Sequence, residues 1–253
     1  WNEGAPTISG DGKKIIFVAC TDNTGVNYGA NRTGKGSCDL FITEKIGNQW
    51  TNPINLPGAV NTANWETQPS LSADGKTLYF IRAIRSREGR SNSDIYVSQL
   101  QNNGLWSEAI RLSNTVNTNQ NEESVQIHPD GKTLYFVSDR PGGFGGSDIY
   151  SVALDANGKF GAVKNLGANV NTEGDEMFPW VVNDLFFFAS NGRPGFGGLD
   201  IFVAPIELGV AAVNAGTVIN TQADDFAVSF FDNSNLGFVA SNRTGGQGGD
   251  DIY

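Results

Sequence analysis

Residues 69–80 read PSLSADGKTLYF, and this stretch decides the fold because near copies of it recur along the chain. Residues 126–136 read QIHPDGKTLYF, residues 6–17 read PTISGDGKKIIF, and weaker copies span 179–188 and 228–238. Self-similarity at a fixed period is the sequence signature of a repeat architecture. Five copies in 253 residues predict one supersecondary unit of roughly 50 residues that is built five times.

Two further pieces recur with this block. A glycine-rich stretch follows it and leads into an Asp-aliphatic-aromatic triplet, whose aspartates are Asp39, Asp94, Asp148, Asp200 and Asp251. Residues 106–118 read WSEAIRLSNTVNT, and the same Val-Asn-Thr ending closes the first and third units, while the fourth keeps VINT at 218–221. The chain starts at Trp1 without a Met, so we expect one domain cut from a longer protein. Its repeats span about 1–62, 63–118, 119–172, 173–221 and 222–253.

Each unit predicts four short strands. Asp-Gly followed by Lys indicates a tight hairpin turn, because glycine accepts a positive φ without a clash of a Cβ atom. β-branched and aromatic residues fill the runs on either side, and turn residues separate the runs. Four antiparallel strands in such a unit form one blade of a β-propeller, and blades pack radially because a lone blade cannot bury both faces. The sequence therefore predicts an all-β propeller with five blades, or with six if one blade lies outside these residues.

The motifs resemble a known family. The pattern P-x-L-S-x-D-G-K-x-L-Y-F, followed by a glycine-rich stretch and D-I-Y, is similar to the WD-repeat-like motif of TolB-type propellers. Residues 141–150, PGGFGGSDIY, together with the closing Val-Asn-Thr, resemble cell-envelope proteins of the Bacteroidota, such as the propeller of OmpA-family, PorE-like type IX secretion proteins. The resemblance covers essentially the whole chain and implies a periplasmic or outer-membrane-associated protein. No OmpA-like segment is present, so peptidoglycan would be bound only through a domain outside these residues.

Composition excludes several classes of function. Lys and Arg total 17 against 27 Asp and Glu, and a net charge of −10 repels the phosphates of nucleic acids. The longest apolar runs are far shorter than the roughly 20 residues that span a bilayer, so we expect no direct membrane insertion. One His and two Cys cannot form a zinc cluster, and His128 is the single candidate for imidazole chemistry. We expect no catalytic residue, no cofactor and no metal site, with weak calcium binding as the one possibility kept open.

Two sets of charges recur on one face. In an antiparallel meander alternate connections share a face, so the start of each unit and the loop after Leu-Tyr-Phe lie opposite the Asp-Gly turns. The two sets of charges either line the channel mouth, where they would bind a cation or a basic peptide, or pair with each other within and between blades. Their repetition in every unit favours pairing. The acids are Glu3, Glu66, Glu123, Glu176 and Asp225, and the arginines are Arg32, Arg87, Arg140, Arg193 and Arg243.

Other side chains on this face give binding candidates and one exclusion. Trp1, Trp65 and Trp180 do not recur in every unit, so we expect them at a binding surface. The glycine-rich loops lead into strands, whereas a phosphate-binding loop leads into a helix, so the sequence argues against nucleotide binding. The aspartate of each triplet instead accepts N–H bonds from its loop.

The two cysteines predict a disulfide. Cys20 ends the second strand of the first unit, and Cys38 starts the third, so they meet at the mouth of one hairpin around the longest loop. A bridge between them indicates an oxidising, extracytoplasmic compartment.

We expect a noncatalytic scaffold of the bacterial cell envelope that binds protein partners in a secretion or envelope complex, and not an enzyme. Propellers offer rigid rings with variable loops, and function depends on those loops. The alternative is a carbohydrate- or peptide-acting enzyme that uses carboxylates near the propeller axis, since paired acids hydrolyse glycosides without a histidine.

Overall fold

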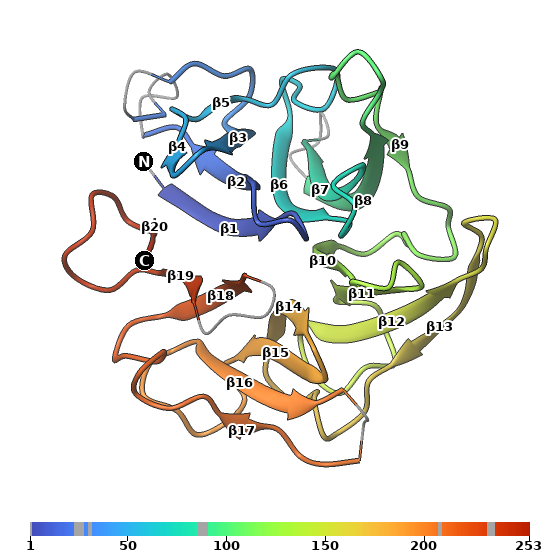
Figure 1. The fold of residues 1–253 in the computed structure, drawn as a ribbon. Coiled ribbons are helices and arrows are strands. Elements are labelled where there is room, and N and C mark those ends of the chain that lie inside the picture. Colours follow the sequence, from blue (N-terminus) through green and yellow to red (C-terminus); the bar gives the residue numbers. More distant parts are fainter. Residues whose placement is uncertain (1, 23–27, 30–31, 86–90, 207–208, 232–235) are drawn as a thin grey trace.

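The computed structural model describes residues 2–22, 28–29, 32–85, 91–206, 209–231 and 236–253, which form five blades around one axis (Figure 1). The first blade contains β1 (Asn2–Ile8), β2 (Lys14–Cys20), β3 (Cys38–Ile46), β4 (Gln49–Trp50) and β5 (Ile54–Asn55), and the second contains β6 (Trp65–Leu71), β7 (Thr77–Arg85), β8 (Ser91–Gln99) and β9 (Ile110–Arg111). The third contains β10 (Glu122–Ile127), β11 (Thr133–Ser138), β12 (Asp148–Leu154) and β13 (Phe160–Asn165). The fourth contains β14 (Glu176–Val182), β15 (Leu185–Ser190), β16 (Asp200–Pro205) and β17 (Val213–Asn214), and the fifth contains β18 (Asp225–Phe230), β19 (Gly237–Ser241) and β20 (Asp251–Ile252).

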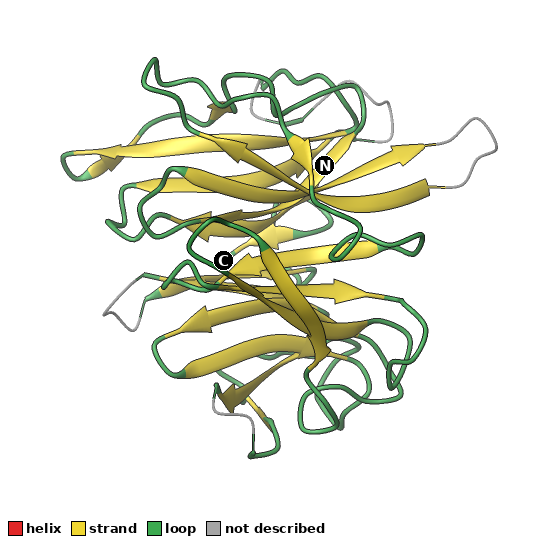
Figure 2. Cartoon of the chain, turned by 90° about the vertical axis from the view of Figure 1, so that its right-hand side faces the viewer, coloured by secondary structure: helices red, strands yellow, loops and turns green. Residues whose placement is uncertain are grey.

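This architecture confirms the predicted all-β propeller of antiparallel blades, and the five blades agree with the expected number. The first strand of each blade, β1, β6, β10, β14 or β18, lies nearest the axis, and later strands follow in chain order toward the rim (Figure 1). Figure 2 shows the blades edge-on, with strands and loops only. In the part of the chain that is described, no helix is long and apolar enough to cross a membrane.

The Asp-Gly turns form as the sequence predicts. Gly12, Gly75 and Gly131 adopt φ values of 66°, 69° and 71°. In the second blade the Asp74 carboxylate accepts hydrogen bonds from the Ser72 hydroxyl at 2.6 Å and from the Lys76 N–H at 3.0 Å. These bonds close the turn locally, so its geometry follows from four neighbouring residues.

The hydrophobic core is divided into five clusters, each shared by two adjacent blades. The Leu-Tyr-Phe runs supply the largest buried rings, including Phe80 and Phe136, which are fully buried. One cluster joins Phe17 and Phe41 of the first blade to Phe238 of the fifth. Because this cluster connects the last blade to the first, the five blades form a closed ring of interfaces.

The two ends of the described chain meet on this ring. The Glu3 N–H donates to the Asp250 carbonyl at 2.9 Å, which places β1 beside the start of β20 (Figure 1). Among the described residues the fifth blade has three strands.

The asparagine of Val-Asn-Thr holds the outer part of each of the first four blades. The Asn117 side chain accepts from the Ile95 N–H at 2.8 Å and donates to the Ile95 carbonyl at 2.9 Å, as a neighbouring strand would. Asn61, Asn171 and Asn220 make the same pair of bonds to Leu40, Ile149 and Ile201. The side-chain amide thus replaces one rung of the ladder where the rim strand has ended.

Candidate functional site

The repeated acids are structural. Glu66, Glu122, Glu176 and Asp225 are fully buried, and each accepts bonds from the N–H and hydroxyl of the threonine four residues before it. Arginine joins this cluster in most blades. The pairs are Arg32–Glu3, Arg82–Glu66 at 2.7 Å, Arg140–Glu122 at 3.0 Å and Arg243–Asp225. The observed pairing therefore agrees with the pairing hypothesis for both sets of charges.

Two members of the predicted sets differ in the structure. In the third blade Glu122 occupies the buried acid position, and Glu123, which the sequence suggested, is the next residue and points away from that cluster. In the second blade Arg82, inside β7, pairs with Glu66, while Arg87 lies outside the described residues. Because Glu122 and Glu123 are consecutive, the repeat pattern alone did not show which of them takes the buried position. Arg82 lies inside β7, whereas the repeat pattern places the arginine in the loop that follows this strand.

Arg193 departs from the pairing pattern in another way. Its guanidinium donates to the carbonyls of Asn169 and Val170, each at 2.9 Å, and Glu176 is satisfied by Thr172 and the Ser190 hydroxyl. The arginine therefore joins the third blade to the fourth through backbone acceptors.

The three candidate tryptophans have different positions. Trp65 begins β6 at the loop-rich face and is 46% exposed. Trp180 lies in the middle of β14 and lines the axis of the ring, so the expectation of a surface position is not met. Trp1 lies outside the described residues.

The triplet aspartates cap the glycine-rich loops, as the sequence predicted. Asp148 accepts from the N–H groups of Phe144 and Gly145, and Asp200 accepts from those of Phe196 and Gly197. A Cβ atom at Gly143 would overlap the Asp148 carboxylate, which explains the glycine at this position. The loops are therefore folded around an internal acid and present no phosphate cradle.

A depression of about 410 Å³ opens at the loop-rich end of the axis, and we call it the mouth depression. Four of the five blades contribute to it, and aromatic, amide and carboxylate side chains alternate around it. Its lining includes Asn2, Glu3, Trp65, Gln68, Met177, Phe178, Leu199, Asp224, Phe226, Asn242 and Asp250. This combination of flat apolar rings and hydrogen-bonding groups is the usual composition of a small-molecule site.

Irregularities in the innermost strands shape the mouth depression. Register shifts interrupt β1, β6 and β14 two residues after the buried acid. At these points Ala5, Gln68 and Phe178 adopt left-handed φ values of 46°, 51° and 53°. A bulge re-aims the side chain of the extra residue, and all three residues line the depression. Non-glycine residues in this conformation are uncommon and concentrate at functional sites.

Two carboxylates at this end of the ring break the repeat. Asp250 lines the mouth depression at the position that is Leu199 in the fourth blade and Ser147 in the third. Glu123 follows the buried acid of the third blade, at the repeat position of Met177 in the fourth, but unlike Met177 it is not among the residues that line the depression. A residue type that occurs in one blade only cannot be explained by the common architecture, so these acids are better functional candidates than the repeated ones.

Both of these acids hold their protons more tightly than usual. Burial, together with the nearby carboxylates of Asp224 and Asp251, raises the pKa of Asp250. Burial and the carboxylates of Asp139 and Asp175 raise the pKa of Glu123, and a 3.0 Å bond from the Ser147 hydroxyl opposes this rise. Of the two, Asp250 lines the mouth depression, and a raised pKa at a concave site is characteristic of a general acid.

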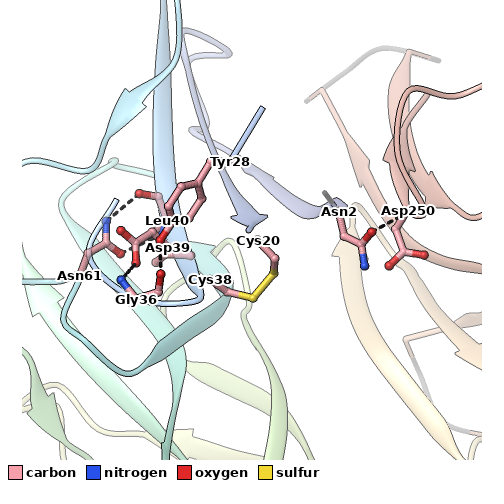
Figure 3. The surroundings of a disulfide bond; sticks show 9 residues. All are labelled: Asn2, Cys20, Tyr28, Gly36, Cys38, Asp39, Leu40, Asn61 and Asp250. Atoms are coloured by element: carbon pink, nitrogen blue, oxygen red, sulfur yellow. Dashed lines mark hydrogen bonds between the residues drawn. A yellow bond between two sulfur atoms is a disulfide. The ribbon is translucent and has the colours of Figure 1, made fainter. Parts of the chain in front are cut away.

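The predicted disulfide is confirmed. Cys20 and Cys38 are directly opposed residues of β2 and β3, with 3.9 Å between their Cα atoms. Cys20 lines the mouth depression together with Asn2 and Asp250, which are hydrogen-bonded to each other (Figure 3). The disulfide therefore fixes one wall of the candidate site and anchors both ends of the long loop.

The described side chains include no group of three or more His, Cys, Asp or Glu that could hold a metal ion. The buried acids already accept hydrogen bonds from threonine and, in most blades, from arginine. Calcium binding stays a prediction.

Solved structures with the same fold are enzymes of low sequence identity. The endo-arabinase from Bacteroides thetaiotaomicron gives a TM-score of 0.53 at 14% identity, over 98% of this chain and 92% of that enzyme. The α-L-arabinofuranosidase from Lactobacillus brevis gives 0.54 at 12%, over 99% and 89%. A puromycin-hydrolysing peptidase from Mycobacterium tuberculosis gives 0.51 at 12%, over 94% of this chain but only 43% of the peptidase. No family model and no curated protein matches the sequence.

These comparisons correct the expected function. A noncatalytic scaffold that is not an enzyme was favoured, but the structures that share the fold are glycoside-cleaving enzymes and a peptidase. The findings agree better with the alternative of a carbohydrate- or peptide-acting enzyme. The repeated acids pair within the blades, whereas Asp250 was not among the residues expected at the site, and Glu123 was expected only as one of the repeated acids. At these identities the likeness establishes the fold and leaves the activity to be argued from the site.

Proposed function

We propose that the chain is a carbohydrate-acting enzyme that hydrolyses a glycosidic bond at the mouth depression. The observations that carry this proposal are the Asp250 carboxylate in the lining of the depression and a second carboxylate found in one blade only, Glu123 of the third blade, and the pKa of each is raised. Glycoside hydrolysis needs two carboxyl groups, one protonated and one ionised, and no histidine or metal.

The surroundings of the two acids assign their roles. Among the described residues the Asp250 carboxylate accepts no hydrogen bond, so nothing there stabilises its ionised form, and it acts as the proton donor to the leaving oxygen. Glu123 accepts the Ser147 hydroxyl, which favours its ionised form, and it acts as the base or nucleophile. The two residues come from the fifth and third blades, which lie on different sides of the axis (Figure 1).

The lining favours a sugar ligand over a peptide. Trp65, Phe178 and Phe226 offer flat apolar faces on which sugar rings stack, and Asn2 and Asn242 offer hydrogen bonds. Both cysteines are in the disulfide, and His128 lies in an Asp-Gly turn, where its Nδ1 accepts the Asp130 N–H. The length comparison supports the same choice, because the chain spans about nine-tenths of the two arabinose-polymer enzymes.

A panel of neutral polysaccharides that includes arabinan tests the proposal. We expect release of reducing ends from at least one member. Asp250→Asn and Glu123→Gln should each lower kcat by about 100-fold or more, and neither should lower the urea midpoint of unfolding. The control is Glu173→Gln, an exposed acid outside the depression, which should retain full activity. Hydrolysis that survives both catalytic substitutions, or no hydrolysis of any glycan, would exclude this function.

The proposed compartment is extracytoplasmic. The Cys20–Cys38 disulfide supports an oxidising environment, since cytosolic thiols are kept reduced. The resemblance of the repeat to TolB-type envelope propellers supports the same place, while its Bacteroidota, type IX secretion and protein-partner aspects stay predictions. Alkylation of thiols in intact cells, before and after reduction, tests the compartment: two free thiols in the native protein would contradict it.

A further inference from the structure

A small cavity lies on the axis of the ring next to the mouth depression, and we call it the axial chamber. This axial chamber has a volume of about 20 Å³ and is ringed by one residue from each innermost strand: Ala5, Gln68, Ser124, Phe178 and Ala227. Ala5, Gln68 and Phe178 also line the depression, so the chamber lies directly beneath it. Trp180 lines the chamber and also a second cavity of about 30 Å³, which places its indole across the channel between the two.

Polar atoms of the chamber residues have no protein partner. Ser124 is 2% exposed, and its Oγ forms no hydrogen bond with any described residue. The buried Nε1 of Trp180 is in the same condition. An unsatisfied buried hydroxyl or indole N–H costs about 1–3 kcal/mol, so native proteins supply a partner for nearly all of them.

We propose that the axial chamber is a binding site for an ordered water molecule held by Ser124, with the Trp180 indole as the neighbouring donor. A water needs roughly 10–15 Å³ of such space and two or more polar partners, and the chamber meets both conditions. The Gln126 amide, which also lines it, is already bonded to Ser70 and to the Ile127 carbonyl. Water fits better than a cation, because an indole N–H can only donate.

The water site gives the mouth depression a hydrated floor. This inference concerns the free protein and does not depend on glycan cleavage.

A matched pair of serines tests the site. Ser229 is also fully buried with an Oγ that has no partner among the described residues, but it lines neither of the two axial cavities. If water bonds Ser124, Ser124→Ala removes a satisfied hydroxyl and lowers the urea midpoint, whereas Ser229→Ala removes an unsatisfied one and leaves the midpoint unchanged or raises it. A rise of the midpoint in both variants would mean a dry chamber and overturn the proposal.

Nuclear magnetic resonance supplies the second readout on the same protein. We expect a cross-relaxation signal between the Trp180 indole N–H and a long-lived water, and its loss or weakening in Ser124→Ala. The absence of any such signal in the wild-type protein would overturn the proposal even if Ser124→Ala lowered the midpoint.

Discussion

Glu122 and Glu123 are adjacent residues with the same side chain, but their surroundings differ. Successive side chains on a strand point to opposite sides, so Glu122 enters the buried cluster with Arg140 and Thr118, while Glu123 bonds only Ser147. One residue of register therefore separates a structural acid from a candidate catalytic one. The sequence restricted the choice to these two, and the strand geometry decided between them.

Removal of the Glu122 carboxylate should destabilise the fold. Glu122→Ala leaves the guanidinium of Arg140, which is mostly buried, without its acid, and we expect a loss of about 3–5 kcal/mol in the free energy of unfolding. Glu123→Gln keeps the bond from Ser147 and should change the same quantity by less than about 0.5 kcal/mol. Urea unfolding of the two variants measures the contrast, and equal losses would refute the assignment.

Asp250 should make stability depend on pH with a defined sign. Its folded-state pKa is raised above the ordinary value of 3.8, so the folded protein binds the proton more tightly than the unfolded chain does. The contribution to stability is therefore full below pH 3.8 and is lost as pH rises through the folded-state pKa. Asp250→Asn removes this loss, so its stability relative to wild type should increase from pH 4 to pH 7. Urea unfolding at several pH values tests this, and a constant difference would contradict it.

At the scale of elements, a side chain extends the pairing at the rim of each of the first four blades. Rim strands such as β9 and β17 are two residues long, and the Val-Asn-Thr asparagine continues their pairing. The sequence showed that this triplet repeats, but its function as a backbone mimic became visible only in the folded blade.

Replacement of the Val-Asn-Thr asparagine should lower the free energy of unfolding. Asn117→Ala leaves the buried N–H of Ile95 without a partner, while the Ile95 carbonyl keeps its bond from the Leu112 N–H, and we expect a loss of about 1–3 kcal/mol in the free energy of unfolding. The control Asn119→Ala removes an exposed asparagine two residues away and should cost less than about 0.5 kcal/mol. Denaturant titration measures the stability of both variants. Similar midpoints would show that the Asn117 side chain contributes little to stability.

The disulfide should stabilise the first blade. It joins residues 18 positions apart, and in the chain-entropy model its closure of that loop contributes about 3 kcal/mol. The double variant Cys20→Ser, Cys38→Ser should therefore unfold at lower urea than the oxidised protein. The wild-type protein in reducing agent should match the variant, and a variant that is as stable as the oxidised protein would contradict the prediction.

At the scale of the molecule, stability belongs to the ring and not to single blades. Each of the five core clusters lies between two blades, so a blade separated from its neighbours exposes half of two clusters. In repeat proteins the nearest-neighbour interfaces supply much of the folding free energy.

A fragment of residues 1–172 should therefore fail to unfold cooperatively, because it lacks three of the five interfaces. A circular permutant that joins residue 253 to residue 2 by a short linker and opens the chain between 172 and 173 keeps every interface. The 2.9 Å bond from Glu3 to Asp250 shows that the join is short. We expect the permutant to give one cooperative transition by circular dichroism. A stably folded fragment would refute ring-level cooperativity.

The sequence by itself determined the blade, its turns and the disulfide, because these depend on neighbouring residues: Asp74 caps its own turn, and Cys20 and Cys38 belong to one hairpin. It also favoured pairing over ligand binding for the repeated charges. Only the tertiary structure decided which residues face the axis, because a one-residue shift in β10 exchanges Glu122 with Glu123, and bulges in β1, β6 and β14 turn side chains toward the mouth. The candidate site combines residues from four blades, and sequence distance carries no information about which of them converge on the axis.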